Sequence, residues 1–402
     1  MHNLTKIKIF RFLLWITYPV AVIFVYPFVL VRKKNPSHLF FFFDRYAIGG
    51  AQRIHLDILQ SVADIHKQVY FTRKSPNDRL KAAFYNVPST DNRDIHIWCD
   101  YLLFRLFSVH YFSFYINRHR RAHVFSSNST FFYDMLPFLN RQVYTTELLH
   151  NFSYGKKGME FFGLANHRLL DARIVYDSFT LSNIRNQYQE YKVDKTYQER
   201  ILFIQPGVEI PGVIAARQLP PLRILYAGRG GPQKRVWLIN KIATYFLERS
   251  APVEFHFAGP LSGEIAPDVA AVSKVHGEIG DKETMNRLYN ECHIIILTSA
   301  YEGFPMVIKE GMSYGCVPVV TALEGNKMHL THQQNALLID AVDDEAEVVR
   351  LGIEQLQKLI DDEALLFRLA TAAREYAVQH FNRDLFMKDY RVFLLNSPPA
   401  KD

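Results

Sequence analysis

The chain has 402 residues, of which 49% are hydrophobic and 22% are charged. At about 100 to 200 residues per domain, this length predicts two domains, or three at most, and the composition excludes a disordered chain. The formal net charge is +7, but six Lys and Arg residues fall within the first 34 positions, ahead of the first acidic residue, Asp44. The rest of the chain is nearly neutral, which argues against a nucleic-acid-binding protein.

An uncharged, apolar segment runs from Phe12 to Val31 between two basic clusters. It is long enough for the roughly 20 residues that span a bilayer, and Trp15, Tyr18 and Tyr26 suit a membrane interface. No small-residue cleavage pattern follows it, which disfavours a signal peptide. Residues 1–35 are therefore predicted to be a hydrophobic membrane anchor that either spans the bilayer or lies in its interface.

Short apolar runs then alternate with helical patterns. The first run, residues 38–44, precedes a turn with Gly49 and Gly50, and further runs begin near residues 67, 122, 141, 172 and 199. Apolar strands separated by helices are typical of a parallel sheet that is covered on both faces. Residues 36–215 are predicted to form one Rossmann-like domain.

The alternation restarts after a proline-bearing stretch, Ala216 to Leu222. The restart predicts a second Rossmann-like domain over residues 216–385, followed by a C-terminal helix and tail, 386–402, that can pack back on the first domain. The three cysteines are far apart, which disfavours a disulfide framework or a zinc site. Because ligands of such sheets bind beyond the carboxyl ends of the strands, we expect the chemistry in the loops that follow strands.

One such loop follows the apolar run that ends near Ser299. It contains Glu302, Gly303 and Phe304, and Glu310 falls in the next helical pattern. Gly303 lets the backbone approach a ligand, and a helix start offers free N–H groups to an anion. The alternative is structural, with Glu302 at a helix start and Glu310 in solvent, and the spacing alone leaves both interpretations open.

The loop after the first strand of the second domain carries Gly228, Arg229 and Lys234 beside a helix start. A dinucleotide fingerprint would need glycine where Gln233 stands and an acidic residue after the next strand, so an oxidoreductase is disfavoured. Two cations here suit a diphosphate whose negative charge grows as a bond to it breaks. A surface turn with two cations is the structural alternative.

Together the two loops resemble the C-terminal half of the retaining, GT-B-type glycosyltransferases of glycosyltransferase family 4, the glycosyl transferases group 1. The family's two motifs are G-R-x-x-x-x-K and E-G-F followed by a second glutamate, and a third element between them matches Gly277. The matching residues are Gly228, Arg229 and Lys234 for the first, and Glu302, Gly303, Phe304 and Glu310 for the second. The resemblance implies two doubly wound α/β domains facing a cleft, the first on the acceptor side and the second binding a nucleotide-sugar donor.

The resemblance also implies a role for each residue. Glu310 would hold the ribose hydroxyls, Glu302 would contact the hydroxyls of the transferred sugar, and Arg229 with Lys234 would stabilise the leaving nucleoside diphosphate. No protein nucleophile, metal or other cofactor is implied, and the sequence has no Asp-x-Asp element.

The first half resembles the same family less distinctively. The turn with Gly49 and Gly50 is similar to the family's first glycine loop, and His150 stands where the family often has a histidine near the donor sugar; a plain turn and a structural histidine are the alternatives. Lys156 and Lys157 are weaker candidates for a lipid phosphate on the acceptor. The aromatic and basic stretch 101–121 is interpreted as a core helix, with a second membrane contact as the alternative.

These patterns predict a membrane-associated, metal-independent hexosyltransferase that transfers a sugar with retention. Its donor is a nucleotide sugar, its acceptor is a lipid-linked saccharide of polysaccharide or glycolipid biosynthesis, and its catalytic domains face the cytoplasm. Two alternatives stay open. A nucleotide-sugar epimerase of the same architecture would need no anchor, and an inactive scaffold of an envelope-assembly complex would not need Arg229, Lys234, Glu302 and Glu310 together.

Overall fold

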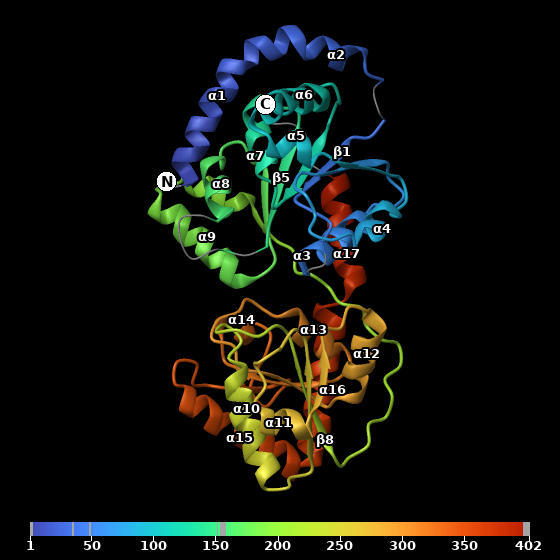
Figure 1. Cartoon of the computed structure of the whole chain (residues 1–402), viewed down its shortest axis with the longest axis vertical. Helices are drawn as coiled ribbons and strands as arrows, with labels where there is room; N and C mark the ends of the chain where they lie inside the picture. The colour runs from blue at the N-terminus through green and yellow to red at the C-terminus, as the bar shows by residue number, and fades with distance from the viewer. Residues whose placement is uncertain (1–2, 34–35, 48–49, 151, 153–157, 397–402) are drawn as a thin grey trace. The chain divides into compact units, whose positions relative to one another are not determined.

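The computed structural model describes residues 3–33, 36–47, 50–150, 152 and 158–396. The chain divides into two compact units (Figure 1): unit 1 contains Met1–Gln205 and Phe386–Asp402, and unit 2 contains Pro206–Leu385. Each unit has its own parallel sheet and its own core. Three predicted site residues, Gly49, Lys156 and Lys157, lie outside the described residues.

Unit 1 is built on a seven-stranded parallel sheet with the order β3-β2-β1-β4-β5-β6-β7. The strands are β1 (Leu39–Phe43), β2 (Lys67–Phe71), β3 (Thr90–Asp94), β4 (His123–Ser127), β5 (Tyr144–Leu149), β6 (Ala172–Val175) and β7 (Ile201–Phe203). The helices are α3 (Gly50–Ser61), α4 (Lys81–Tyr85), α5 (His96–Asp100), α6 (Leu102–Asn117), α7 (Thr130–Met135), α8 (Glu160–Ala165) and α9 (Ser178–Glu190), with two 3-10 helices, η1 (Leu136–Phe138) and η2 (Lys195–Arg200).

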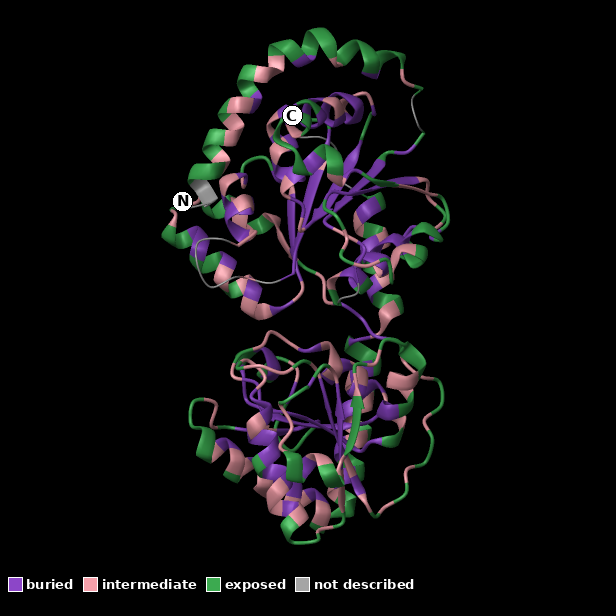
Figure 2. Ribbon diagram, in the orientation of Figure 1, coloured by how far each residue is buried: buried purple, intermediate pink, exposed green. Residues whose placement is uncertain are grey.

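Both faces of this sheet are buried, as its apolar runs predict (Figure 2). Successive side chains of a strand point to opposite faces. In β1, Phe40 and Phe42 join a core with residues of α6 and α7, whereas Phe41 and Phe43 join a core with residues of α3. The run of phenylalanines thus serves two separate cores.

The chain returns to unit 1 after unit 2. The returning helix is α17 (Arg383–Leu395), which places Phe386, Tyr390 and Leu394 in the core beside α3. The polypeptide therefore passes between the units twice.

The predicted N-terminal apolar segment forms two helices, α1 (Asn3–Phe24) and α2 (Tyr26–Val31). One side of α1 packs on unit 1, where Tyr18 stacks on Phe138 with ring centroids 5.5 Å apart and Arg11 donates a 2.7 Å hydrogen bond to Asn166. The other side is exposed and apolar (Figure 2), with Phe12, Trp15, Ile16, Val20, Ile23 and Phe24. Residues Thr5–Phe24 are long and apolar enough to cross a membrane, which by itself is only weak support for membrane association.

Unit 2 is built on a six-stranded parallel sheet with the order β10-β9-β8-β11-β12-β13. The strands are β8 (Leu222–Ala227), β9 (Val253–Ala258), β10 (Lys274–Gly277), β11 (Ile294–Leu297), β12 (Val317–Thr321) and β13 (Leu337–Ile339). The helices are α10 (Val236–Glu248), α11 (Pro267–Val272), α12 (Lys282–Glu291), α13 (Met306–Ser313), α14 (Glu324–Lys327), α15 (Glu345–Asp361) and α16 (Glu363–His380).

Three strands are not revealed by the apolar runs, namely β3, β10 and β13. All three are edge strands of their sheets. β13 is apolar but only three residues long, LLI, whereas β3 and β10 read TDNRD and KVHG. An edge strand has a single neighbour and meets solvent, so it does not need the continuous apolar run that a central parallel strand needs.

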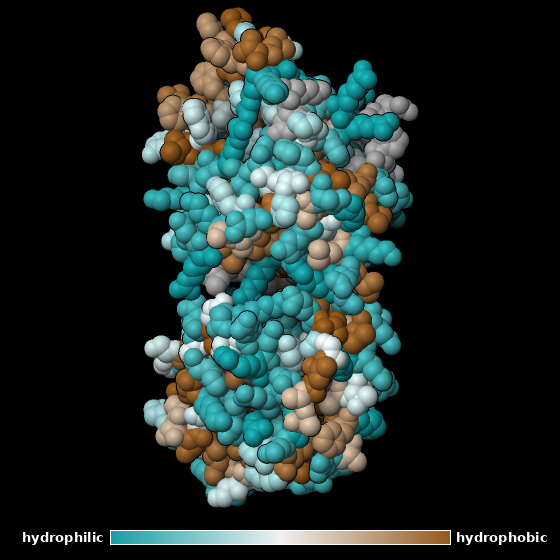
Figure 3. All heavy atoms as spheres, turned by 90° about the vertical axis from the view of Figure 1, so that its right-hand side faces the viewer, coloured by the Kyte–Doolittle hydropathy of each residue, from teal (hydrophilic) through white to brown (hydrophobic). Residues whose placement is uncertain are grey.

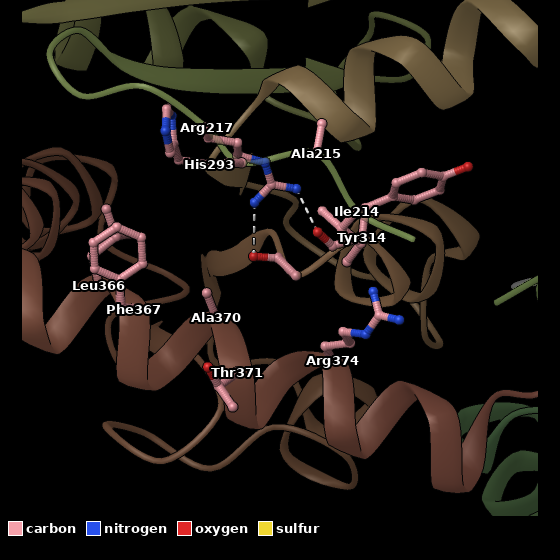
Figure 4. A pocket seen from close by; sticks show the side chains of 12 residues that line it. Ile214, Ala215, Arg217, His293, Tyr314, Leu366, Phe367, Ala370, Thr371 and Arg374 are labelled. Carbon is pink, nitrogen blue, oxygen red and sulfur yellow. Dashed lines mark hydrogen bonds between the residues drawn. The ribbon is translucent and has the colours of Figure 1, made fainter. Parts of the chain in front are cut away.

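The segment that enters unit 2 is fixed at the amino ends of the strands by Arg217. Its guanidinium donates hydrogen bonds to four backbone oxygens, two of which are drawn in Figure 4; the acceptors are Tyr289, Asn290, Tyr314 and Gly315. These carbonyls end α12 and α13, where a cation also complements the helix dipoles. A pocket of about 220 Å³ lies beside Arg217 and His293, at the opposite end of the sheet from the loops that follow the strands.

A buried ion pair in unit 1 joins β5 to β6. Arg173 is hydrogen-bonded to Glu147 through Nε and donates to the Tyr188 hydroxyl at 2.9 Å, while the Tyr133 hydroxyl donates to Glu147 at 2.5 Å. Both charged residues are 1% exposed. A methyl group on Gly163 would come 2.2 Å from the Arg173 guanidinium, so glycine leaves room for the pair.

Replacing Arg173 by Met should destabilise unit 1, because the Glu147 carboxylate then stays buried without its counter-charge. We expect the free energy of unfolding to fall by about 3 to 5 kcal/mol, measured by chemical denaturation. The control is Arg141→Met at an exposed position, which should change the free energy of unfolding by less than about 0.5 kcal/mol. The double variant Glu147→Met/Arg173→Met should recover part of the lost stability. If Arg173→Met alone left the stability unchanged, the buried ion pair would not stabilise unit 1.

Candidate functional site

The candidate site lies in the loops after β8 and β11. These strands are parallel neighbours in the unit 2 sheet, so the loops at their carboxyl ends lie side by side. Gln233 connects the two loops: its side-chain amide donates to the Tyr301 backbone oxygen at 3.0 Å, and its backbone oxygen accepts from the Ala300 N–H at 2.8 Å. The two motifs seen in the sequence thus form one surface.

The predicted residues Lys234 and Glu302 are in direct contact. Lys234 Nζ lies 2.5 Å from Glu302 Oε1, and the two side chains are only 12% and 15% exposed. Gln233 donates to the same carboxylate oxygen at 3.2 Å and accepts from the exposed Arg229 guanidinium at 3.0 Å. Two cations, one carboxylate and one amide therefore form a continuous polar cluster at the carboxyl ends of β8 and β11.

Arg235, which the sequence analysis did not single out, holds these loops in place. It is the N-cap residue of α10, with a left-handed backbone (φ 50°), and it is 5% exposed. Its guanidinium donates to the backbone oxygens of Thr298 at 2.7 Å, Ser299 at 3.1 Å and Val342 at 2.8 Å. The only sequence signal was a second cation directly after Lys234, and nothing local distinguishes a buried arginine from a surface one.

Close backbone packing around the cluster requires glycine at two positions. A methyl group on Gly325, in α14, would come 1.6 Å from the Gly303 backbone oxygen. Gly259 has φ +134°, and a methyl group there would come 1.9 Å from the Gly228 oxygen. The backbone oxygen of Gly277 accepts from the Gly259 N–H at 2.7 Å. The predicted glycines Gly228, Gly277 and Gly303 therefore take part in one stack of loops.

Glu310 lies farther along, within α13. Its Oε2 accepts a 2.6 Å hydrogen bond from the Tyr289 hydroxyl of α12, and the Tyr289 ring stacks on Tyr314 with centroids 5.9 Å apart. Tyr289 therefore orients the carboxylate, a role that the sequence pattern did not reveal. Pro305 is the N-cap residue of α13, directly before the first helical residue, Met306.

Phe304 faces packed side chains. Its ring centroid lies 4.6 Å from that of His329 and 5.3 Å from that of Phe381. The adjacent Lys309 is 1% exposed and donates to the Pro206 backbone oxygen at 3.0 Å, with its ammonium 5.3 Å from the Phe381 ring. Phe304 therefore supports the loop through packing, and Lys309 ties α13 to the start of unit 2.

In unit 1, the candidate His150 follows β5 and pairs with His55 of α3. Their Nε2 atoms are 2.8 Å apart, and burial lowers the pKa of His150 to about 3. Burial and the neighbouring ring hold the pKa of His55 well below its ordinary value. Both rings are therefore neutral, one donating to the other, and neither Nδ1 has a hydrogen-bond partner among the residues that the structure describes. The predicted Gly50 starts α3 and has open space at its Cα.

No group of three or more His, Cys, Asp or Glu side chains that could hold a metal ion occurs within the described part of the chain. The predicted independence of metals and cofactors stays a prediction.

Residues 221–358 match the family model described as "Glycosyl transferases group 1". Among solved structures, the chain is similar to Anabaena Alr3699/HepE in complex with UDP, with a TM-score of 0.65 and 14% identity over 87% of this chain and 97% of that one. It is also similar to the apo form of the lipopolysaccharide outer core galactosyltransferase WaaB, with a TM-score of 0.65 and 18% identity over 90% and 99% of the two chains. A search of curated proteins finds no match.

These comparisons confirm the resemblance to group 1 glycosyl transferases of GT-B fold and the fold class predicted from the sequence. The retaining mechanism and the assignment to family 4 stay predictions. The family model covers most of unit 2, including Gly228 to Lys234 and Glu302 to Glu310. The two parallel sheets with their helices form the two-domain α/β fold of GT-B glycosyltransferases. At these identities the structural likeness establishes the fold alone.

The buried histidine pair should make unit 1 sensitive to acid. A histidine whose folded pKa lies below its unfolded value stabilises the fold above the unfolded pKa, near 6.5, and loses that contribution as pH falls toward the folded pKa. For a folded pKa of about 3 at His150, lowering the pH from 7 to 5 should cost about 2 kcal/mol. The check is chemical denaturation at both pH values.

His150→Gln should remove most of this loss at His150 while keeping a polar side chain beside His55. If the stability of the variant and of the parent chain depended on pH in the same way, His150 would not be the source of the acid sensitivity. Other buried histidines lower the stability at acid pH in both proteins alike. The test is therefore the difference between the stability losses of the parent chain and of the variant from pH 7 to pH 5.

Proposed function

We propose that this chain is a glycosyltransferase that binds a nucleotide-sugar donor in unit 2. The observation that carries the proposal is the cluster of Arg229, Gln233, Lys234 and Glu302 at the carboxyl ends of β8 and β11, where ligands of such sheets bind. The match of residues 221–358 to group 1 glycosyl transferases supports it. The complexes of Anabaena HepE with UDP and with UDP-glucose support a uridine nucleotide as the donor's leaving group.

The Lys234–Glu302 pair explains how the cluster can serve a donor. With no donor bound, Glu302 neutralises Lys234 in a largely buried position. A diphosphate offers Lys234 and Arg229 a more highly charged partner, and the carboxylate is then free to accept hydrogen bonds from sugar hydroxyls. Fixed cations aimed at the leaving phosphate stabilise the charge that develops as the glycosidic bond breaks.

Glu310 and Tyr289 would form the nucleoside end of the site. The hydrogen bond from Tyr289 to Oε2 of Glu310 fixes the orientation of the carboxylate, and a carboxylate can accept several hydrogen bonds, including those from ribose hydroxyls. We propose that His150, kept neutral by burial, serves as a hydrogen-bonding group near the transferred sugar rather than as a cation.

We further propose transfer with retention, without a metal, to a lipid-linked acceptor at the cytoplasmic face of a membrane. The exposed apolar side of α1 and the basic clusters that flank the apolar segment support the membrane part. Because the opposite side of α1 packs on unit 1 at Arg11 and Tyr18, we favour a helix that lies in the interface over one that spans the bilayer.

Binding of UDP tests the donor site directly. Lys234→Ala and Glu310→Ala should each weaken UDP binding by about 1 to 3 kcal/mol, as for the loss of a hydrogen-bonded charge, measured by isothermal titration calorimetry. The matched control is Lys241→Ala, an exposed lysine of the adjacent helix α10, which should leave the affinity unchanged. Equal affinity in Lys234→Ala and the parent chain would exclude Lys234 from the site, and no binding of any nucleotide by folded protein would favour a scaffold.

The stereochemistry of the product tests the proposed transfer with retention. Incubation with an α-linked UDP-sugar should give a product with an α linkage, identified by NMR from the anomeric proton coupling. A β-linked product would exclude retention, and release of an epimerised sugar nucleotide would identify an epimerase instead.

A further inference from the structure

We propose that a pocket in unit 1 binds the hydrocarbon chain of the lipid that carries the acceptor sugar, an inference that rests on the proposed function. The pocket lies between α2 and the helices α5 and α6 and has a volume of about 930 Å³, within the upper part of the range of roughly 300 to 1,000 Å³ that small-molecule sites occupy. Aromatic side chains dominate its lining, including Phe24, Phe28, Trp98, Phe104, Phe107 and Phe112.

Specific contacts hold the two walls of this pocket together. Arg118, at the end of α6, donates to the backbone oxygens of Val29 and, at 2.9 Å, of Arg32. The Arg32 guanidinium lies 4.5 Å from the centroid of the Tyr115 ring, and the rings of Tyr26 and Phe114 are 5.2 Å apart. Helix α2 is therefore fixed on α6, and the space between them is a built feature of the fold.

Several apolar side chains that line the pocket are also exposed at the surface. Phe24 and Phe28, on the side of α1 and α2, are 65% and 71% exposed, and Trp98, on the other side, is 54% exposed. Figure 3 shows hydrophobic side chains gathered at the end of unit 1 that carries α1 and α2. Exposed apolar surface of this extent marks an interaction site, and with the basic flanks of α1 and α2 it suits an anionic bilayer. A hydrocarbon chain can enter from that side.

The polar rim of the pocket is near the end of the sheet where ligands bind. Arg93 and Asp94 end β3, and Asp94 accepts from the hydroxyl of Tyr46 at 3.2 Å. Tyr46 belongs to the loop that follows β1 and leads into α3. Arg32 also lines the pocket. Two guanidinium groups and one carboxylate line the pocket, which favours a negatively charged head group, and arginine is well suited to phosphate. Arg32 also donates to the Tyr111 hydroxyl. A phosphate held by Arg93 would lie at the carboxyl end of β3.

Photolabelling of the full chain tests this pocket. The protein is reconstituted in vesicles of phosphatidylcholine and phosphatidylglycerol with a trace of a long-chain alkyl phosphate that carries a diazirine. After irradiation, mass spectrometry should locate the label in residues 24–32, 92–98 and 104–112 despite the excess of phospholipid. The same chain ending in an alcohol should label the pocket several-fold less.

A charge placed in the pocket should strongly reduce the labelling. Phe107→Arg should lower the yield of labelled protein by about tenfold or more, and a tenfold change corresponds to about 1.4 kcal/mol. The matched control is Leu103→Arg, one turn earlier on α6, at a 70% exposed position that does not line the pocket, and it should keep the labelling. Phe28→Arg, on the opposite wall, repeats the test at a position whose exposure makes misfolding an unconvincing explanation.

Four outcomes would overturn the proposal. The first is that the label is found in α1 alone, and the second is that Leu103→Arg lowers the labelling as much as Phe107→Arg does. The third is that the alcohol labels the pocket as strongly as the phosphate. The fourth is that the parent chain is not labelled and forms a dimer in detergent that Phe107→Arg dissociates. UDP binding, measured on the same samples, separates this proposal from the proposed function. If UDP still binds and the pocket is not labelled, the lipid site fails and the donor site stands. If UDP does not bind, the proposed function fails whatever the label shows.

Discussion

The guanidinium of Arg235 holds three backbone segments of unit 2 in one arrangement, through the carbonyls of Thr298, Ser299 and Val342. A buried charge is tolerated only when its hydrogen-bonding capacity is used, and carbonyl oxygens satisfy it without cancelling the charge. Because Arg235 directly follows Lys234, fixing one residue also fixes the other beside Glu302. The chemistry assigned to the cluster thus depends on a neighbour that faces away from the ligand.

Parallel sheets explain why the site forms where it does. Every strand of such a sheet delivers its following loop to the same edge, and adjacent strands deliver adjacent loops. In unit 2 this brings together β8 and β11, whose loops are about 70 residues apart in sequence. The glycines at positions 259 and 325 then let neighbouring loops approach more closely than a Cβ atom would allow.

Unit 1 uses its aromatic residues in two different ways. Phe41 and Phe43 are buried beside α3, whereas Phe24 and Phe28 line a pocket that opens to the surface. The stretch 101–121 combines both uses: most of α6 from Leu106 onward is buried, whereas its first residues and Phe107 are exposed. The core helix and the membrane contact, which the sequence presented as alternatives, are compatible within one helix.

The sequence by itself determined the class of the fold, since central parallel strands must be apolar throughout. It also singled out Arg229, Lys234, Glu302 and Glu310 as candidates, because their motifs are local. It did not reveal β3 and β10, because these edge strands are polar and carry no such constraint, and it did not reveal β13, which is apolar but only three residues long. It interpreted Gln233 only as a departure from a dinucleotide fingerprint, whereas the structure makes it the link between two loops. The partners Arg235, Tyr289 and His55, and the pocket beside α2, were decided by tertiary structure alone. Burial and hydrogen bonding between residues far apart in the chain give these groups their environment, and no local pattern records which distant group will supply it.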